Sequence, residues 1–255
     1  MRRLAALLLF WLTLASAQAR EQFTVCFDDW APYAAYTPER GHYGITVTLM
    51  REIFNDMGLG LKLQSATQSR CVAAAHAGRI DIMLFGDKEA LPAHWLATTI
   101  PTEFWLVGAW VPQQSPLQRY EQLSQFNGLR VATVTDYIYP APIHGYHGWR
   151  SVMVGDAIDG VRQLAARRVD VMFDDLIWMR EIAKSKKLKI RMLPPLIAAQ
   201  PQQHFYKPHL APLFERYEQE VQARIKRGEL DARYRAALGI SYDALRRGDY
   251  AGALQ

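Results

Sequence analysis

The features that this sequence lacks exclude several function classes. The 255-residue chain has only two cysteines, Cys26 and Cys71, and no histidine stands near them at ligand spacing, so a zinc-type metal site is not expected. The chain contains neither Gly-x-Ser-x-Gly nor His-Glu-x-x-His, the signatures of two common hydrolase mechanisms. Its net charge of +5 is mild and does not favour a nucleic-acid partner. We therefore expect no metal, no cofactor and no nucleic-acid binding.

Long hydrophobic runs are absent after the first residues of the chain. The start combines the basic Met1–Arg3, the apolar Leu4–Ala15 and the small-x-small segment Ala17–Ala19. This order is typical of a secretory signal peptide, and the apolar run is too short to span a bilayer. A lipoprotein would require a cysteine directly after Ala19, and none is present there. We therefore expect 1–19 to be a cleaved signal peptide and the mature protein to be periplasmic.

Both cysteines belong to the part of the chain that would be exported. An oxidising compartment and an even cysteine count make a disulfide between Cys26 and Cys71 possible. Two separate buried thiols are the alternative. The oxidising compartment and the even number of cysteines favour the disulfide.

A short pattern that occurs twice indicates the fold class. Ala77–Met83 reads AGRIDIM, and Arg167–Met172 reads RRVDVM. Each copy follows a helical, alanine-containing stretch and runs on into apolar and then acidic residues, which together make an α/β unit. In open α/β sheets, ligands bind at the carboxyl ends of the strands. The sequence therefore predicts an α/β protein with two similar lobes that face a shared cleft.

Proline-containing stretches suggest where the chain passes between these lobes. Two such stretches, at 112–116 and 193–195, are expected linkers. We predict a first lobe from 20–111 plus 193–240, a second lobe from 112–192, and a tail at 241–255 with no assigned role. A hinge of this kind permits closure around a ligand, and clefts between domains are preferred ligand sites.

Several weak motifs along nearly the whole mature chain occur in a characteristic order. They are an acidic-aromatic-proline loop, a glycine-led helix entry, the two copies of the repeated pattern, and a glycine-led strand between them: Asp28–Tyr33, Gly44–Leu49, Ala77–Met83, Val169–Asp175 and Asn127–Val131. In this order they resemble the periplasmic solute-binding proteins of family 3, the polar amino-acid type of ABC transporters. The resemblance implies a two-lobed periplasmic-binding-protein fold, capture of a small polar solute and no catalysis.

The resemblance also has implications for the cysteines and the ligand. Some similar members carry Arg-Cys before the second helix, as Arg70 and Cys71 do here, with a partner cysteine in the first strand, as Cys26 is. Amino-acid binders use an arginine about a dozen residues after Gly-x-x-Asp to clamp the ligand carboxylate. Residues 88–94 contain no arginine. We therefore expect an atypical ligand, with Lys88 or Arg70 as the anion partner.

Each candidate binding residue also has a structural interpretation. Asp175 lies at a strand end, where its carboxylate could meet a ligand cation or cap the following helix, and Asp174 is expected to cap or to face solvent. Trp30 and Tyr33 could line the ligand or pack the lobe. The segment after 134 could offer backbone amides to an anion. The full candidate set is Asp28, Trp30, Tyr33, Arg70, Phe85, Gly86, Lys88, Thr135, Asp136, Tyr137 and Asp175.

Three function classes fit these observations. The leading hypothesis is a non-catalytic, monomeric receptor that closes over a small polar solute and delivers it to a membrane transporter permease. The second is a dehydratase-like periplasmic enzyme on the same scaffold, for which Glu89, His94, Asp174 and Asp175 are the suggestive acid-base groups. The third is an accessory or sensory protein that presents its closed form to a sensor.

Overall fold

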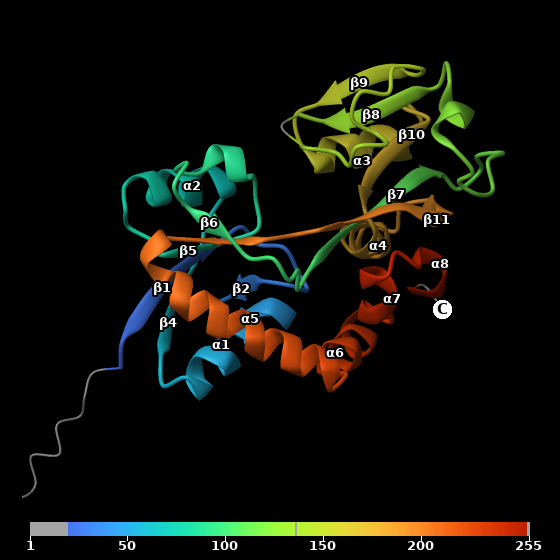
Figure 1. Cartoon of the computed structure of the whole chain (residues 1–255). Helices are drawn as coiled ribbons and strands as arrows, with labels where there is room; N and C mark the ends of the chain where they lie inside the picture. Colours follow the sequence, from blue (N-terminus) through green and yellow to red (C-terminus); the bar gives the residue numbers. More distant parts are fainter. Residues whose placement is uncertain (1–19, 136, 254–255) are drawn as a thin grey trace, which may run out of the picture.

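The computed structural model describes residues 20–135 and 137–253, which form two α/β lobes joined by a long β ribbon (Figure 1). The predicted α/β fold with two lobes is confirmed. The predicted signal peptide lies outside the described residues. Within the described part of the chain, no helix has the length and apolar character needed to cross a membrane.

The first lobe is built around a five-stranded sheet. Its strand order is β4 (Gly60–Ser65), β1 (Gln22–Phe27), β5 (Ile82–Leu84), β12 (His204–Tyr206) and β6 (Leu96–Ala97). β1 runs parallel to β4 and β5, and β12 runs antiparallel to β5. The lobe also contains α1 (Ile45–Asp56), α2 (Gln68–His76), α5 (Ala211–Lys226), α6 (Glu229–Leu238), the hairpin β2 (Ala35–Thr37) and β3 (Gly41–Tyr43), and the short helices η1 (Lys88–Ala90) and η3 (Pro208–Leu210).

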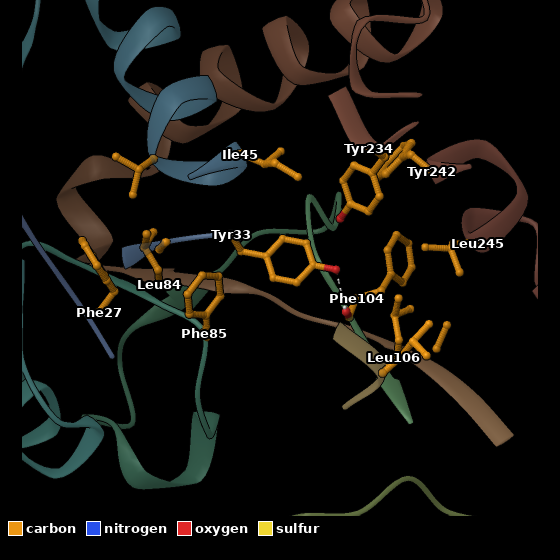
Figure 2. Packing of buried hydrophobic residues seen from close by; sticks show 14 of the residues in the cluster. Phe27, Tyr33, Ile45, Leu84, Phe85, Phe104, Leu106, Tyr234, Tyr242 and Leu245 are labelled. Atoms are coloured by element: carbon orange, nitrogen blue, oxygen red, sulfur yellow. Dashed lines mark hydrogen bonds between the residues drawn. The ribbon is translucent and has the colours of Figure 1, made fainter. Parts of the chain in front are cut away.

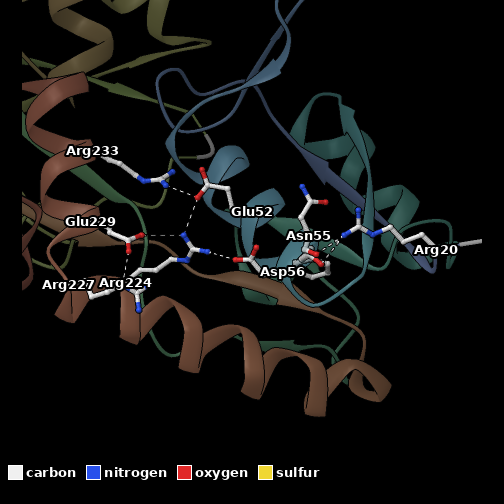
Figure 3. A network of polar contacts seen from close by, with 9 residues as sticks. Arg20, Glu52, Asn55, Asp56, Arg224, Arg227, Glu229 and Arg233 are labelled. Atoms are coloured by element: carbon white, nitrogen blue, oxygen red, sulfur yellow. Dashed lines mark hydrogen bonds and ion pairs between the residues drawn. The ribbon is translucent and has the colours of Figure 1, made fainter.

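Helices α1 and α5 pack through apolar stripes at helical spacing. Phe54 on α1 contacts Phe214 and Tyr217 on α5, with ring centroids 6.5 and 6.1 Å apart. Along the rim of this contact, the Arg224 guanidinium lies 2.7 Å from Asp56 and 3.2 Å from Glu52 (Figure 3). The apolar stripe supplies most of the stabilisation, because partly exposed ion pairs contribute little.

The second lobe contains the other five-stranded sheet. Its order is β11 (Ile190–Pro201), β7 (Phe104–Pro112), β10 (Val171–Asp175), β8 (Arg130–Val134) and β9 (Arg150–Val154). Helices α3 (Ala157–Ala165) and α4 (Leu176–Ser185) pack on one face with Met172. Gly160 lets α3 approach closely, since a Cβ there would lie 2.7 Å from Met172 Cε. The other face packs against the loop around Tyr139 and Ile143 and against η2 (Leu123–Phe126).

Strands β7 and β11 form the ribbon that reaches from one lobe to the other (Figure 1). They pair antiparallel from Phe104 with Pro201 to Pro112 with Ile190. The predicted lobe limits at 111 and 193 differ from this arrangement, because both strands belong to the second sheet along their whole length. The proline-containing stretch at 112–116 lies at the far end of the ribbon. The segments that leave the first sheet are instead 98–103 and 202–203.

The repeated sequence pattern has the same structural role in each lobe. Asp81 Oδ2 accepts a hydrogen bond from Thr24 N at 2.9 Å, and Asp170 Oδ2 accepts one from Arg130 N at 2.9 Å. In both lobes, this carboxylate binds the start of the neighbouring parallel strand. Gly78 and Arg167 both have positive φ, at 69° and 58°, which closes the preceding helix. The pattern therefore encodes the lobe architecture and lies away from the strand ends that could bind a ligand.

The predicted Cys26–Cys71 disulfide is confirmed. It joins β1 to α2 and is buried with Met83, Trp95 and Phe205. The bridge thereby fixes α2 against one face of the first sheet, near the carboxyl end of β1.

The C-terminal segment, which the sequence left without a role, is folded. It forms α7 (Tyr242–Arg246) and α8 (Tyr250–Ala253). Tyr242 is buried, donates its hydroxyl to Pro101 O at 2.7 Å, and packs against Phe104 (Figure 2). Helix α7 therefore covers the point where the chain leaves the first sheet for the ribbon.

Candidate functional site

The carboxyl ends of β1 and β4 bring Asp28 to the start of α2. Asp28 Oδ2 accepts a hydrogen bond from Gln68 N at 3.2 Å, and its Oδ1 accepts one from Asp29 N at 2.9 Å. Asp28 is nevertheless exposed, so its charge faces outward from the strand ends. The lining of a ligand cleft by Asp28 stays a prediction.

Aromatic residues continue the first-lobe wall beside Asp28. Trp30 is half-buried and meets Phe85 edge-on, with ring centroids 5.2 Å apart. Phe85 and Gly86 follow β5 with φ of 60° and 107°. Positive φ is costly for phenylalanine, and such strained positions often mark functional loops. A Cβ at Gly86 would lie 3.3 Å from Gln68 Nε2, so the glycine brings this loop close to α2.

Tyr33 does not form part of a cleft wall. Its side chain is completely buried, and its hydroxyl donates to Phe104 O at 3.2 Å (Figure 2). Burial raises the pKa of Tyr33 well above its usual value, and the charges of Asp175 and Glu103 raise it further. The expected ligand contact is therefore corrected: the proline-bearing turn directs Tyr33 into the core of the first lobe.

The second lobe contributes an aromatic group around Tyr137. Tyr137 is 41% exposed and meets Trp105 of β7 at right angles, with ring centroids 5.6 Å apart. Trp105 also lies 5.6 Å from Tyr139. Thr135 is exposed, but its hydroxyl donates to Val154 O at 3.0 Å. Asp136, another candidate, lies outside the described residues.

Carboxylates from both lobes act on Tyr137. Partial burial is the main cause that raises the pKa of Tyr137, and the charges of Asp174, Asp175, Asp28 and Asp156 raise it further. Asp28 belongs to the first lobe, whereas the other three belong to the second. All four charges act in the same direction on the Tyr137 hydroxyl, which they keep protonated.

Asp175 is a helix cap in this structure. Its Oδ1 accepts hydrogen bonds from Ile177 N at 2.9 Å and Trp178 N at 2.8 Å, and its Oδ2 accepts one from Leu106 N at 3.3 Å. It is 3% exposed. Burial raises its pKa to about 6, although the three backbone hydrogen bonds lower it. Asp175 therefore N-caps α4, one of the two roles expected for it, and its contact with a ligand cation stays a prediction.

Asp174 is buried, contrary to the expectation that it would cap a helix or face solvent. Its Oδ1 accepts a hydrogen bond from Asp175 N at 2.7 Å. Its Oδ2 has no hydrogen-bond partner in the described part of the chain. Burial raises the pKa of Asp174 to about 8. Burial therefore favours the protonated, neutral form of this carboxyl at neutral pH.

The two candidate anion partners differ in their surroundings. Lys88 Nζ donates to Trp95 O within its own loop, so Lys88 stabilises that loop. Arg70 is exposed on α2. The structure therefore leaves Arg70 as the more accessible of these two cations.

Sequence reasoning missed several residues near this site. Trp105 lies in β7, and its position beside Tyr137 depends on the pairing of β7 with β10 and β11. Asp156 caps α3 by accepting a hydrogen bond from Asp159 N at 2.7 Å, and only the fold brings it towards Tyr137. A shallow pocket of about 490 Å³ also lies beside the ribbon, lined by Ile138, Tyr139, Pro140, Ala141, His144, Ala198, Ala199 and Gln200.

A fully buried polar pair lies where the chain enters the ribbon. His204 Nε2 is 3.1 Å from both carboxylate oxygens of Glu103, and these two side chains are 2% and 0% exposed. Thr102 Oγ1 donates to Glu103 Oε1 at 2.5 Å, and the Thr46 hydroxyl of α1 donates to the same oxygen. Glu103 precedes β7, and His204 begins β12. The pair therefore joins the two segments that connect the lobes.

We expect Asp175→Ala to lower the free energy of unfolding by about 1–2 kcal/mol, because it removes the cap of α4. Asp175→Asn should retain much of that stability, since its Oδ1 still accepts hydrogen bonds. Urea denaturation of the mature chain measures both. Equal stability of the alanine variant and the parent protein would contradict the capping role.

Comparisons with known proteins show the fold. No protein-family model and no curated protein matches the sequence. Among solved structures, the probable amino-acid ABC transporter extracellular-binding protein ytmK from Bacillus subtilis superposes with a TM-score of 0.72 at 15% identity, over 86% of this chain and 98% of that chain. The chain has the fold of an extracellular binding protein.

Two further structures have the same fold and different roles. A histidine kinase sensor domain with similarity to periplasmic binding proteins has a TM-score of 0.67 at 23% identity, over 86% of this chain and 97% of that chain. An ancestral arginine-binding protein bound to arginine has a TM-score of 0.66 at 14% identity, over 86% and 99% of the two chains. At such identities, the likeness establishes architecture and leaves the ligand open.

Proposed function

We propose that this chain is a periplasmic solute-binding protein of family 3, which captures a small polar solute between its lobes for an ABC transporter. The observation that carries the proposal is the fold, in which two lobes with a five-stranded sheet each are joined by the β7–β11 ribbon and superpose on an extracellular-binding protein over 86% of this chain. Ligands of open α/β sheets bind at such strand ends. The structural neighbours are themselves binding proteins, which supports a binding role.

A non-catalytic role agrees with the state of the suggested acid-base groups. Asp175 is occupied by three backbone hydrogen bonds. Glu89 lies in η1 and His94 in the following loop, both on the Lys88 side of the first lobe. Asp174 has an oxygen without a hydrogen-bond partner in the described part of the chain, but the neighbours with this fold are binding proteins.

A sensory role is the second candidate. The sensor domain of a histidine kinase has the same two-lobed architecture over nearly its full length. In that role the closed form would be recognised by a membrane sensor in place of a transporter permease. Both roles require the same first step, which is solute binding in the cleft.

Binding to a panel of small solutes tests the proposal. We expect one class among amino acids, amines, organic acids and sugars to stabilise the mature chain by about 2.7 kcal/mol at 100 times its dissociation constant, measured by thermal shift and confirmed by calorimetry. Trp30→Ala should weaken that binding, because Trp30 forms the first-lobe wall. Met153→Ala is the control, since Met153 is 63% exposed on the edge strand β9.

Two outcomes would count against a solute-binding role. One is that no member of the panel stabilises the chain or releases heat on titration. The other is a hit whose affinity is the same in the parent protein and in Trp30→Ala, which would place the ligand elsewhere.

A further inference from the structure

We propose that the second lobe carries a separate binding site for an anionic amphiphile, a molecule with a negatively charged head and an apolar tail. The juxtaposition that carries the proposal is an apolar groove beside the ribbon, an arginine without a partner in its wall, and a lysine-rich turn at its end. A free fatty acid and a membrane phospholipid share this chemistry. The site is distinct from the cleft of the proposed function and does not depend on it.

The groove lies between helix α4 and the strands β7 and β11 (Figure 1). Its volume is about 510 Å³, which is within the range of pockets that hold small molecules. Its apolar lining includes Ala183 of α4, Trp110 of β7, and Ile190 and Met192 of β11. An alkyl chain in this groove would be removed from water, which is favourable in proportion to the apolar area that is covered.

The floor of the groove is formed by side chains that lie on the sheet. Trp110 is 3% exposed and is the partner of Met192 in the pairing of β7 with β11. A Cβ at Gly108 would lie 2.6 Å from Met192 Sδ, so the missing side chain at Gly108 lets Met192 lie across β7. Methionine is flexible and fits apolar surfaces of irregular shape. The floor can therefore adapt to an alkyl chain.

Arg180 supplies an unused positive charge in the wall of the groove. Partial burial lowers the pKa of its guanidinium, and no carboxylate of the described residues offsets this effect. Arg130, in the same lobe, is instead paired with Asp170 at 2.7 Å. Arg191, the other cation of the lining, donates to Ser115 O at 3.0 Å. Arg180 is therefore the group that remains available to bind an anionic head.

A lysine-rich turn borders the same groove. It folds back on the end of α4, where Leu188 N donates to Ala183 O at 2.8 Å. Glu181 is the one acidic residue between Arg180 and Arg191 in the sequence. Four exposed lysines occupy the end of the helix and the turn: Lys184, Lys186, Lys187 and Lys189. This concentration of positive charge attracts anions to the groove.

The groove is separate from the strand ends of the proposed cleft. Trp110 lies about 17 Å along β7 from Trp105, at the usual rise of an extended strand. The two side chains also lie on opposite faces of the sheet, since Trp105 packs with Tyr139 and Trp110 packs with Met172. A ligand in the groove therefore needs no contact with the cleft.

Matched amphiphiles test the ligand class on the mature chain by calorimetry, at concentrations below those at which they form micelles. We expect octanoate to bind, and the neutral octanol, the cationic octylammonium and the short anion acetate each to bind at least about 10-fold more weakly. Octanol lacks the charge of octanoate, and acetate lacks its tail. Binding of octanol or octylammonium that equals the binding of octanoate would overturn the inference.

Two variants locate the contact. Arg180→Gln removes the charge at an exposed position, and we expect it to weaken octanoate binding by about 10-fold, the loss of one charge-assisted contact. Ala183→Leu narrows the groove and should also weaken binding. Arg168→Gln is the matched control, because it removes the same charge from an exposed position after α3 and should leave binding unchanged. Urea denaturation of each variant checks that it is folded. Unaltered affinity in Arg180→Gln would overturn the site.

Vesicles distinguish the two sources of such a ligand. Sedimentation with phosphatidylglycerol vesicles but not with phosphatidylcholine vesicles, weakened in Arg180→Gln and unchanged in Arg168→Gln, would identify a membrane phospholipid. Octanoate binding without vesicle binding would identify a free fatty acid. Both results support the inference, whereas the absence of both would overturn it. If Trp30→Ala weakens octanoate binding as much as Arg180→Gln does, the ligand occupies the cleft and the separate site is overturned.

Discussion

Replacement of Glu103 by leucine should lower the free energy of unfolding by about 3–5 kcal/mol, because it removes one partner of a fully buried, hydrogen-bonded polar pair. The change leaves His204 buried without its carboxylate and deprives Thr46 and Thr102 of their common acceptor. Urea denaturation at neutral pH measures the loss. This is the largest effect of a single substitution that we expect in the chain.

A double-mutant cycle separates the interaction from the loss of packing. We expect Glu103→Leu with His204→Leu to cost less than the sum of the two single changes, because the double variant leaves no uncompensated partner. Glu220→Leu is an exposed control and should change stability by no more than about 0.5 kcal/mol. A loss below about 1 kcal/mol for Glu103→Leu would show that the buried pair contributes little.

Reduction of the Cys26–Cys71 bridge should have an effect of similar size. The bridge closes a loop with a sequence separation of 45, which limits the unfolded chain and stabilises the protein by about 4 kcal/mol in the chain-entropy model. The measurement compares urea denaturation of the oxidised protein with that of the reduced protein. The loop contains α1, β3 and β4, so reduction should loosen the first lobe.

The double variant Cys26→Ala with Cys71→Ala is the control for this prediction. Its stability should be close to that of the reduced protein and should not respond to a reducing agent. If the oxidised and reduced proteins unfold at the same urea concentration, the bridge does not restrict the unfolded chain as proposed.

The fold could be predicted from sequence because it depends on local patterns. The repeated sequence pattern, which contains Asp81 in its first copy and Asp170 in its second, encodes a helix, a turn and a strand each time. In the structure, each of these aspartates accepts a hydrogen bond from a neighbouring strand. The residues at which the lobes begin and end were harder to predict from the sequence. Strand β7 joins the second sheet because it pairs with β10 and β11, and such long-range pairing leaves no local sequence signal.

The candidate site could be predicted only in part, because sequence position does not determine side-chain direction. Asp28, Trp30 and Tyr137 lie at strand ends as expected. Tyr33 and Asp175 occupy similar sequence positions but point into the protein, where they bond to Phe104 O and to the start of α4. A strand-end aspartate can equally bind a ligand or cap a helix, and only its hydrogen-bond partners distinguish these roles.

The packing of the C-terminal helices affects how the lobes can move. Helix α7 packs on the first lobe through Tyr242, and α8 contacts β11 of the second sheet. The chain therefore connects the lobes three times, through β7, β11 and this final segment. Two antiparallel strands alone would allow both bending and twisting about the ribbon. A third attachment at one side restrains the twist, so relative motion of the lobes reduces to bending about a single axis.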